Sequence, residues 1–265
     1  NKMSDLIQDA LPLMEQLNPM QANVAKKHGI PMFKGILYEN ITDDYGNTIL
    51  KKVNENTVVI GGAVLALEHL CNATSSWKPA TLNTIYKVNA AVTGDNAQSF
   101  ISLFGVGIGG SALTFGNVLT PDVKQRDVMS LIPLRTGASI TGTDADKYFF
   151  RKDNGGGTYN WYLKEFNATP TIKSLWKDSA VSGVDGTEIL EEIYNSERTE
   201  GVESLMEFSL KLNTSDVREY FESIGELNMA RYNSIGLFTG QKVQISTGYY
   251  DYANVRLFST VNINN

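Results

Sequence analysis

The sequence predicts an α+β protein that is rich in β-strand, a predominantly antiparallel sheet or sandwich with a few short helices and an N-terminal helical arm. Most apolar segments of the 265-residue chain alternate with polar residues at every second position, the period of a half-buried strand. Segments with helical spacing are few and short, and neither an internal repeat nor a proline-rich linker divides the chain. We therefore expect an arm at residues 1–30 and a single β-rich domain at residues 31–265, with the polar stretch 178–201 as an alternative boundary.

The N-terminal arm has an apolar stripe at helical spacing, formed by Ile7, Ala10, Leu11, Met14 and Leu17. Pro12 and Pro19 interrupt the stripe, and a short helix broken by proline is unstable alone in water. Because the stripe is too apolar to stay solvated, we expect the arm to pack on its own domain or on a neighbouring subunit.

The first part of the domain is predicted as a hairpin, a helix and a buried strand. Residues 31–42 and 48–53 have strand patterns on either side of the polar turn Asp43–Asn47. A short amphipathic helix follows at Ile60–Leu70. Residues 99–108 are apolar on both faces, which is typical of a central strand.

The middle of the chain combines an irregular stretch with an aromatic hairpin. Residues 109–145 are rich in glycine, serine, threonine and aspartate, except for the segment 128–134. Irregular stretches of this length are usually functional or interfacial. Aromatic residues at 148–150 and 159–166 flank a glycine-rich turn, which predicts a hairpin. A further strand is expected at Ile172–Trp176.

The C-terminal part has the clearest strand and helix patterns. A strand is predicted from alternation, with its apolar side chains facing inward: Met206, Phe208, Leu210 and Leu212. A helix is predicted from the spacing of Val217, Tyr220, Phe221 and Ile224. Ser215 or Asp216 would cap this helix, Asp216 and Glu219 would lie in its first turn, and Gly225 would end it. Two more strands are expected at Asn233–Thr239 and Val255–Ile263.

Composition disfavours several classes of function. The net charge is −6 and the isoelectric point is about 5.1, which argues against duplex nucleic acid as the main ligand, because contacts to phosphates need clustered lysine and arginine. No apolar run is long enough to suggest a membrane span, and no signal-peptide pattern is visible. Cys71 is the only cysteine, which excludes an intrachain disulfide, and its place on an apolar helical stripe predicts a small core residue.

The run Gly105–Gly110 matches the spacing of a dinucleotide-binding loop after a strand. That function requires a helix to open at the glycines and an acidic residue on a following strand. Serine, threonine and then Pro121 follow instead, and no strand–helix–strand unit frames Asp127. We expect a strand end at which another part of the backbone approaches closely.

No catalytic, cofactor-binding or metal-binding residue is assigned from the sequence. His28 and His69 are the only histidines, and neither lies in a motif that would orient it for catalysis. Asp144 and Asp146 offer oxygen ligands but lack the rest of a calcium loop, so a polar turn is favoured.

A carbohydrate-binding or adhesin-like module is the alternative function. Aromatic side chains on strands and loops would form its binding surface, first Trp161 and Trp176, and also Tyr249, Tyr250 and Tyr252. Packing or a protein interface is the more common role of such residues.

Several segments together resemble recurring patterns in virion structural proteins of tailed bacteriophages. They are Leu205–Leu212, Ser215–Phe221, Asn233–Gly240, Asn56–Glu68 and Phe104–Gly109. The resemblance implies a structural component of a phage particle without catalytic residues and without a cofactor. It also implies a virion location, with copies of the chain and other virion proteins as partners. We favour a position at the neck, collar, tail or head–tail junction, in which several copies form a ring.

Overall fold

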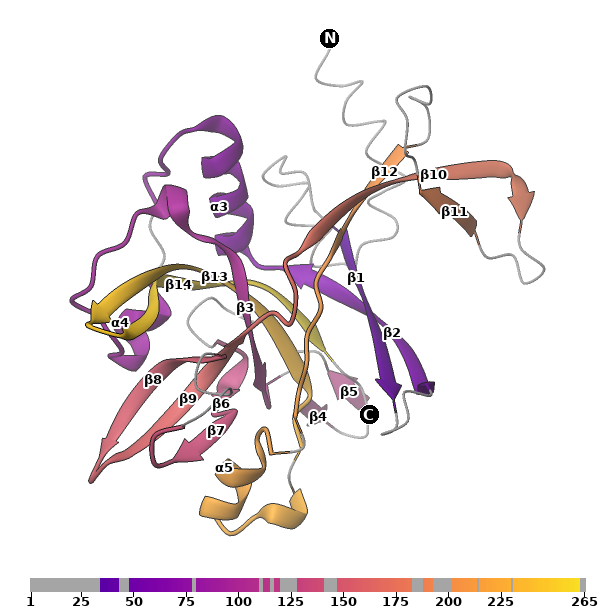
Figure 1. The fold of residues 1–265 in the computed structure, drawn as a ribbon. Helices are drawn as coiled ribbons and strands as arrows, with labels where there is room; N and C mark the ends of the chain where they lie inside the picture. Colours follow the sequence, from indigo (N-terminus) through magenta and orange to yellow (C-terminus); the bar gives the residue numbers. More distant parts are fainter. Residues whose placement is uncertain are drawn as a thin grey trace. The chain divides into compact units, whose positions relative to one another are not determined.

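The computed structural model describes residues 34–42, 48–77, 80–109, 112–114, 117–119, 128–140, 147–182, 188–192, 202–213, 215–229 and 231–262 (Figure 1). The predicted fold class is confirmed, because antiparallel strands dominate and the helices are few and short. The predicted N-terminal arm lies outside the described residues. The chain divides into two compact units. Unit 1 contains the residues up to Ile101, Gly105–Ile132 and Arg231–Asn265, and unit 2 contains Ser102–Phe104 and Pro133–Ala230.

Unit 1 is built on two antiparallel hairpins. Its strands are β1 (Lys34–Thr42), β2 (Thr48–Val58), part of β3 (Phe100–Gly107), β4 (Ala112–Thr114), β5 (Asn117–Leu119), β6 (Leu131–Ile132), β13 (Ser234–Ser246) and β14 (Tyr249–Asn262). The predicted β1–β2 hairpin is confirmed, and β2 pairs with β14, which pairs along most of its length with β13. The two C-terminal strands expected from alternation are therefore partners in one long hairpin.

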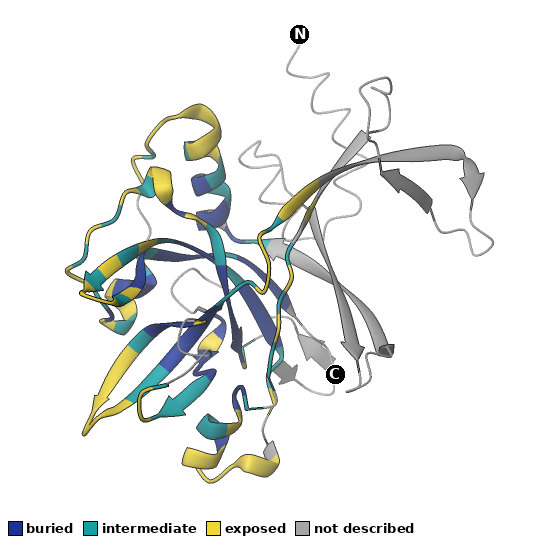
Figure 2. Ribbon diagram, in the orientation of Figure 1, coloured by how far each residue is buried: buried dark blue, intermediate teal, exposed yellow. Residues whose placement is uncertain are grey.

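Short helices complete unit 1: α3 (Ile60–Cys71), α4 (Leu82–Tyr86), η1 (Asn96–Gln98) and η2 (Val128–Ser130). The predicted helix at Ile60–Leu70 is confirmed as α3. Gly62 allows α3 to approach β14, because a Cβ at this position would overlap the backbone of Phe258. Leu65 is buried beneath the helix, whereas Leu70 at its far end is 75% exposed. Figure 2 shows the same change along α3, from buried residues at its start to exposed residues at its end.

Asn83 joins α4 to the C-terminal hairpin of unit 1. The side chain is 3% exposed. Its Nδ2 donates to the carbonyl oxygens of Val88 and Tyr252, at 3.0 and 2.9 Å, and its Oδ1 accepts from the amide of Val255 at 2.8 Å. Because the amide group is so fully bonded, this buried polar residue has a structural role.

Unit 2 contains an antiparallel hairpin and a separate three-stranded sheet, which we call the ribbon. Its elements are β7 (Arg135–Gly137), β8 (Tyr148–Gly155), β9 (Thr158–Glu165), β10 (Thr171–Ser182), β11 (Glu188–Glu192), β12 (Val202–Glu207), α5 (Arg218–Ser223) and η4 (Leu227–Met229). The predicted aromatic hairpin is confirmed as β8–β9, with Gly155, Gly156 and Gly157 at positive φ in its turn. β7 also pairs with β9, and Leu103 and Phe104 of β3 pair with its C-terminal end.

The ribbon places β10 between β11 and β12 (Figure 1). The predicted strand at 172–176 is confirmed and extends to Ser182. The prediction of a strand at 206–212 is wrong beyond Glu207. Met206, expected to face inward, is 48% exposed, and the chain leaves the ribbon at Phe208. The ring centres of Phe208 and Phe166 lie 5.0 Å apart. At Phe208 this aromatic contact therefore replaces the strand pairing that the sequence predicted.

The helix at 217–224 is confirmed in part. α5 buries Val217 and Phe221 on one face and ends before Gly225, whose φ is +74°. Ile224, expected on the buried stripe, is 48% exposed. The predicted cap is wrong, because Val217 occupies the N-cap position and makes no side-chain cap bond. Asp216 is instead drawn into a buried network.

Candidate functional site

A buried polar network in unit 2 centres on the carboxylate of Asp216. Tyr148 Oη donates to Asp216 Oδ1 at 2.6 Å, and Lys164 Nζ donates to Oδ2 at 3.0 Å. The backbone amide of Asn213 also donates to Oδ2, at 2.7 Å. The side chains of Lys164 and Asp216 are 4% and 1% exposed. Charge-assisted hydrogen bonds therefore connect Asp216, in the turn before α5, to Tyr148 on β8 and Lys164 on β9.

The environment of Tyr148 stabilises its neutral form. Burial, and then the nearby carboxylate of Asp216, raise the pKa of Tyr148 well above its usual value of 10.0. Lys164 Nζ also lies 4.8 Å from the centre of the Tyr148 ring. Because both ends of the Lys164–Asp216 ion pair are almost fully buried, the pair is shielded from contact with a substrate, and loss of either partner would leave an uncompensated buried charge.

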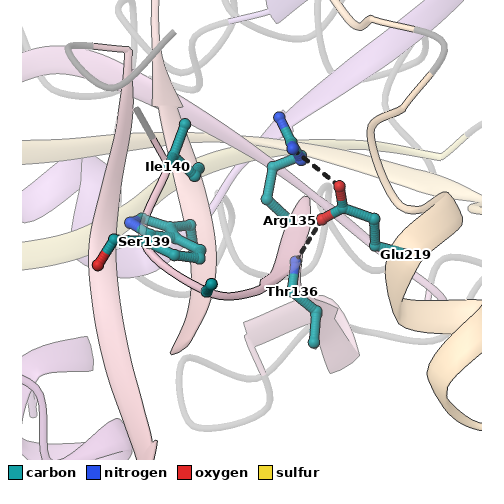
Figure 3. A pocket seen from close by; sticks show the side chains of 7 residues that line it. Arg135, Thr136, Ser139, Ile140 and Glu219 are labelled. Carbon is teal, nitrogen blue, oxygen red and sulfur yellow. Dashed lines mark hydrogen bonds and ion pairs between the residues drawn. The ribbon is translucent and has the colours of Figure 1, made fainter. Parts of the chain in front are cut away.

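A pocket of about 300 Å³ lies in unit 2, and its lining residue Arg135 has its guanidinium carbon 5.5 Å from the centre of the Tyr148 ring of this network. Its lining comes from β7, the residues that follow it, β9 and α5: Arg135, Thr136, Ala138, Ser139, Ile140, Trp161 and Glu219. In Figure 3, Ser139 and Ile140 lie on one side of the pocket and Arg135 and Glu219 on the other. Trp161 is the cross-strand partner of Arg135.

An ion pair organises one wall of the pocket. Arg135 Nη2 lies 2.8 Å from Glu219 Oε1, and Glu219 Oε2 accepts from the amide of Thr136 at 2.9 Å (Figure 3). The hydrogen bond to Glu219 outweighs desolvation and raises the pKa of Arg135 still further, so the guanidinium stays charged. Nε of Arg135 and Oγ1 of Thr136 are buried and have no hydrogen-bond partner. The pocket thus presents donors and acceptors with no net charge.

The described residues contain no cluster of three side chains that could hold a metal ion. Asp144 and Asp146, weighed as calcium ligands, lie outside them, as does His28. His69 is exposed on α3, with its ring 5.8 Å from that of Phe100. Within unit 2, each carboxylate oxygen of Glu219 already accepts one bond, Oε1 from Arg135 and Oε2 from the amide of Thr136, and each has room to accept another.

The expected role of the glycine run is confirmed. The backbone of Met129 approaches Gly107 and Gly109, where added Cβ atoms would overlap it. The amide of Gly109 donates to the Met129 carbonyl at 2.9 Å, and that of Ile108 donates to Ser130 at 3.2 Å. A strand, β4, begins at Ala112, where a nucleotide-binding loop would need a helix.

Two other sequence predictions are corrected. Cys71, expected in the core, is exposed at the end of α3, because the helix buries its opposite, N-terminal part. The three tyrosines do not form one platform. Tyr252 is 3% exposed, Tyr249 donates to Asp251 at 2.8 Å, and only Tyr250 is largely exposed.

Of the two tryptophans singled out for sugar binding, Trp161 lines the pocket, and Trp176 lies in β10, where its side chain is outside the described residues. Sequence motifs did not identify Arg135, Glu219 or Asp216 as partners in a site. One signal was present, namely Lys164 within the apolar run of a hairpin strand. A buried lysine requires an opposite charge nearby, but the sequence does not say which acid supplies it.

Comparisons with protein-family models, with curated proteins and with solved structures found no match to this chain. Among the described residues, no helix has the length and apolar character needed to cross a membrane.

Proposed function

We propose that this chain is a structural subunit of a phage particle and assembles in several copies through protein–protein contacts, at the neck, collar or tail. Its partners would be copies of itself and other virion proteins, and its role would be non-enzymatic. The motif resemblance in the sequence suggests this class. The structural observation that carries the proposal is a pair of exposed apolar side chains on the ribbon of unit 2.

Ile172 on β10 and Met206 on β12 are direct cross-strand partners and therefore share one face of the ribbon. They are 76% and 48% exposed. A single exposed apolar residue is ordinary, but two adjacent ones on a sheet face form a small apolar surface suited to contact with another protein. We call these two residues the ribbon pair.

Unit 1 carries a second exposed apolar surface at the end of α3. It consists of Leu67, His69, Leu70 and Phe100, and we call it the helix-end patch. Leu70 and Phe100 are 75% and 60% exposed, and Leu67 lies one turn from Leu70 on the same helix face. A closed ring built from identical subunits needs two different contact surfaces on each subunit. The ribbon pair and the helix-end patch are our candidates for these surfaces.

The proposal is tested by sedimentation velocity of the full chain over a range of concentrations, and by its presence in purified particles. We expect an oligomer that dissociates when Ile172→Lys or Leu70→Lys is introduced. Thr171→Lys and Ala73→Lys are matched controls, because they place the same charge at neighbouring exposed positions. A chain that stays monomeric at every concentration and is absent from particles would overturn the proposal. Equal dissociation by the control variants would reject these two surfaces.

A further inference from the structure

We propose that the pocket of unit 2 formed by Arg135, Thr136, Ser139, Trp161 and Glu219 is a binding site for one neutral sugar ring. This activity is separate from assembly and does not depend on it. The pocket volume of about 300 Å³ lies at the lower end of the range for small-molecule sites, which suits a single ring rather than a large cofactor.

The polar groups of the pocket match the chemistry of sugar hydroxyls. Each hydroxyl can donate one hydrogen bond and accept others. The guanidinium of Arg135 supplies donors and the carboxylate of Glu219 supplies acceptors, and their ion pair holds them 2.8 Å apart. Adjacent hydroxyls on a sugar ring present donors and acceptors at comparable spacing. Ser139, exposed at the opposite side of the pocket, adds a group that can do both (Figure 3).

Two polar atoms in these lining residues have unmet hydrogen-bonding capacity. Arg135 Nε and Thr136 Oγ1 are buried and make no hydrogen bond. Both atoms are closed off from solvent, so a ligand would bond instead to the accessible parts of Arg135 and Glu219, whose side chains are 20% and 31% exposed. Trp161 also contributes to the lining, but it is only 6% exposed, and the accessible lining is mostly polar. Most small-molecule sites are predominantly apolar, so this mostly polar lining favours a strongly hydroxylated ligand.

The charges in the pocket favour a neutral sugar over an anion. Arg135 is already paired with Glu219, so a phosphate or carboxylate ligand would have to compete with that pair. It would also approach the negative charge of Glu219, which is repulsive. A neutral hexose can hydrogen-bond to both groups while the ion pair stays intact. The pocket should therefore discriminate against acidic sugars and inorganic phosphate.

The test is saturation-transfer NMR of the full chain with glucose, galactose, mannose, glucuronate and inorganic phosphate, each at millimolar concentration, with phosphate followed through its phosphorus signal. We expect binding of at least one of the three neutral hexoses and none of the two anions. Ser139→Phe should abolish hexose binding, because the new ring fills the pocket from an exposed position. Ser246→Phe, at an exposed serine of unit 1, should leave hexose binding unchanged.

A second variant tests the role of charge. Glu219→Gln keeps the size of the side chain but releases Arg135 from its ion pair, so we expect hexose binding to weaken at least tenfold and phosphate or glucuronate binding to appear. Circular dichroism would verify that each variant is folded. The proposal is overturned if no neutral hexose binds, if an anion binds the unmodified chain more tightly, or if Ser139→Phe retains binding. Because Ser139→Phe does not alter the ribbon pair or the helix-end patch, sedimentation of this variant separates failure of the sugar site from failure of the assembly proposal.

Discussion

Replacing Asp216 with asparagine should strongly destabilise the protein. The amide has nearly the shape of the carboxylate, and its oxygen can still accept a hydrogen bond from Tyr148 or from the amide of Asn213. It removes the negative charge, so the ammonium of Lys164, which is 4% exposed, is left without its counter-charge. The substitution therefore isolates the charge from the shape of the side chain.

The expected magnitude follows from burial. Removing one partner of a buried ion pair costs about 3–5 kcal/mol, because an uncompensated charge remains in a medium of low polarity. That cost is a large fraction of the free energy of unfolding of most domains, which is about 5–15 kcal/mol. Urea denaturation, followed by far-ultraviolet circular dichroism, would measure the free energy of unfolding. Glu222→Gln makes the same chemical change at an exposed position of α5 and should alter stability by no more than about 0.5 kcal/mol.

The double variant Lys164→Met with Asp216→Asn provides the sharper comparison. If the cost arises from an unpaired charge, removing that charge should restore much of the stability lost in Asp216→Asn alone. The reasoning would be refuted by an Asp216→Asn protein as stable as the Glu222→Gln control. It would equally be refuted by a double variant whose loss equals the sum of the two single losses.

Tyr148, Gly107 and Phe221 each occupy a position at which burial or close contact should control stability. Because the pKa of Tyr148 is raised above 10.0, the folded protein keeps the phenol proton at a pH at which the unfolded chain has lost it. The free energy of unfolding should therefore fall as the pH rises above 10.0. In urea titrations across the alkaline range, Tyr148→Phe should show a smaller fall. Gly107→Ala should cost about 1–3 kcal/mol in thermal or urea unfolding, because its Cβ would overlap the backbone of Met129, and an unchanged melting temperature would contradict this close approach. Phe221→Ala should lower the free energy of unfolding by about 3–5 kcal/mol, since Phe221 is 5% exposed. Ile224→Ala should change it by no more than about 0.5 kcal/mol, because Ile224 is 48% exposed. Equal losses in the two variants would mean that the buried face of α5 is misassigned.

The local pattern of residues was sufficient to predict the longer hairpins of the fold. Alternation predicted β13 and β14, and aromatic residues around a glycine turn predicted the β8–β9 hairpin. These predictions succeeded because neighbouring strands of a hairpin need only a compatible turn and a repeat of two residues. The same reasoning assigned the glycines before β4 to close backbone contact, although it could not name Met129 as the residue that approaches them.

Prediction failed where a residue's surroundings come from distant parts of the chain. The spacing of α5 suggested four buried side chains, yet a helix this short covers only Val217 and Phe221 and leaves Ile224 in solvent. Alternation likewise placed Met206 inward, but the ribbon buries neither that side chain nor Ile172 opposite it. Periodicity shows which residues share a face, and only tertiary packing decides whether that face is covered.

The candidate site shows the same contrast between what sequence patterns predict and what tertiary packing decides. The sequence by itself determined a β-rich chain with a net charge of −6, a single cysteine and no familiar catalytic motif, because composition and short-range spacing are properties of the chain alone. Only the tertiary structure brought Lys164 to Asp216, and Arg135 and Thr136 to Glu219. The Lys164–Asp216 and Thr136–Glu219 hydrogen bonds span 52 and 83 residues of the chain. The physical reason is that a buried charge needs an opposite charge in space, and strands and turns can supply it from any position in the sequence.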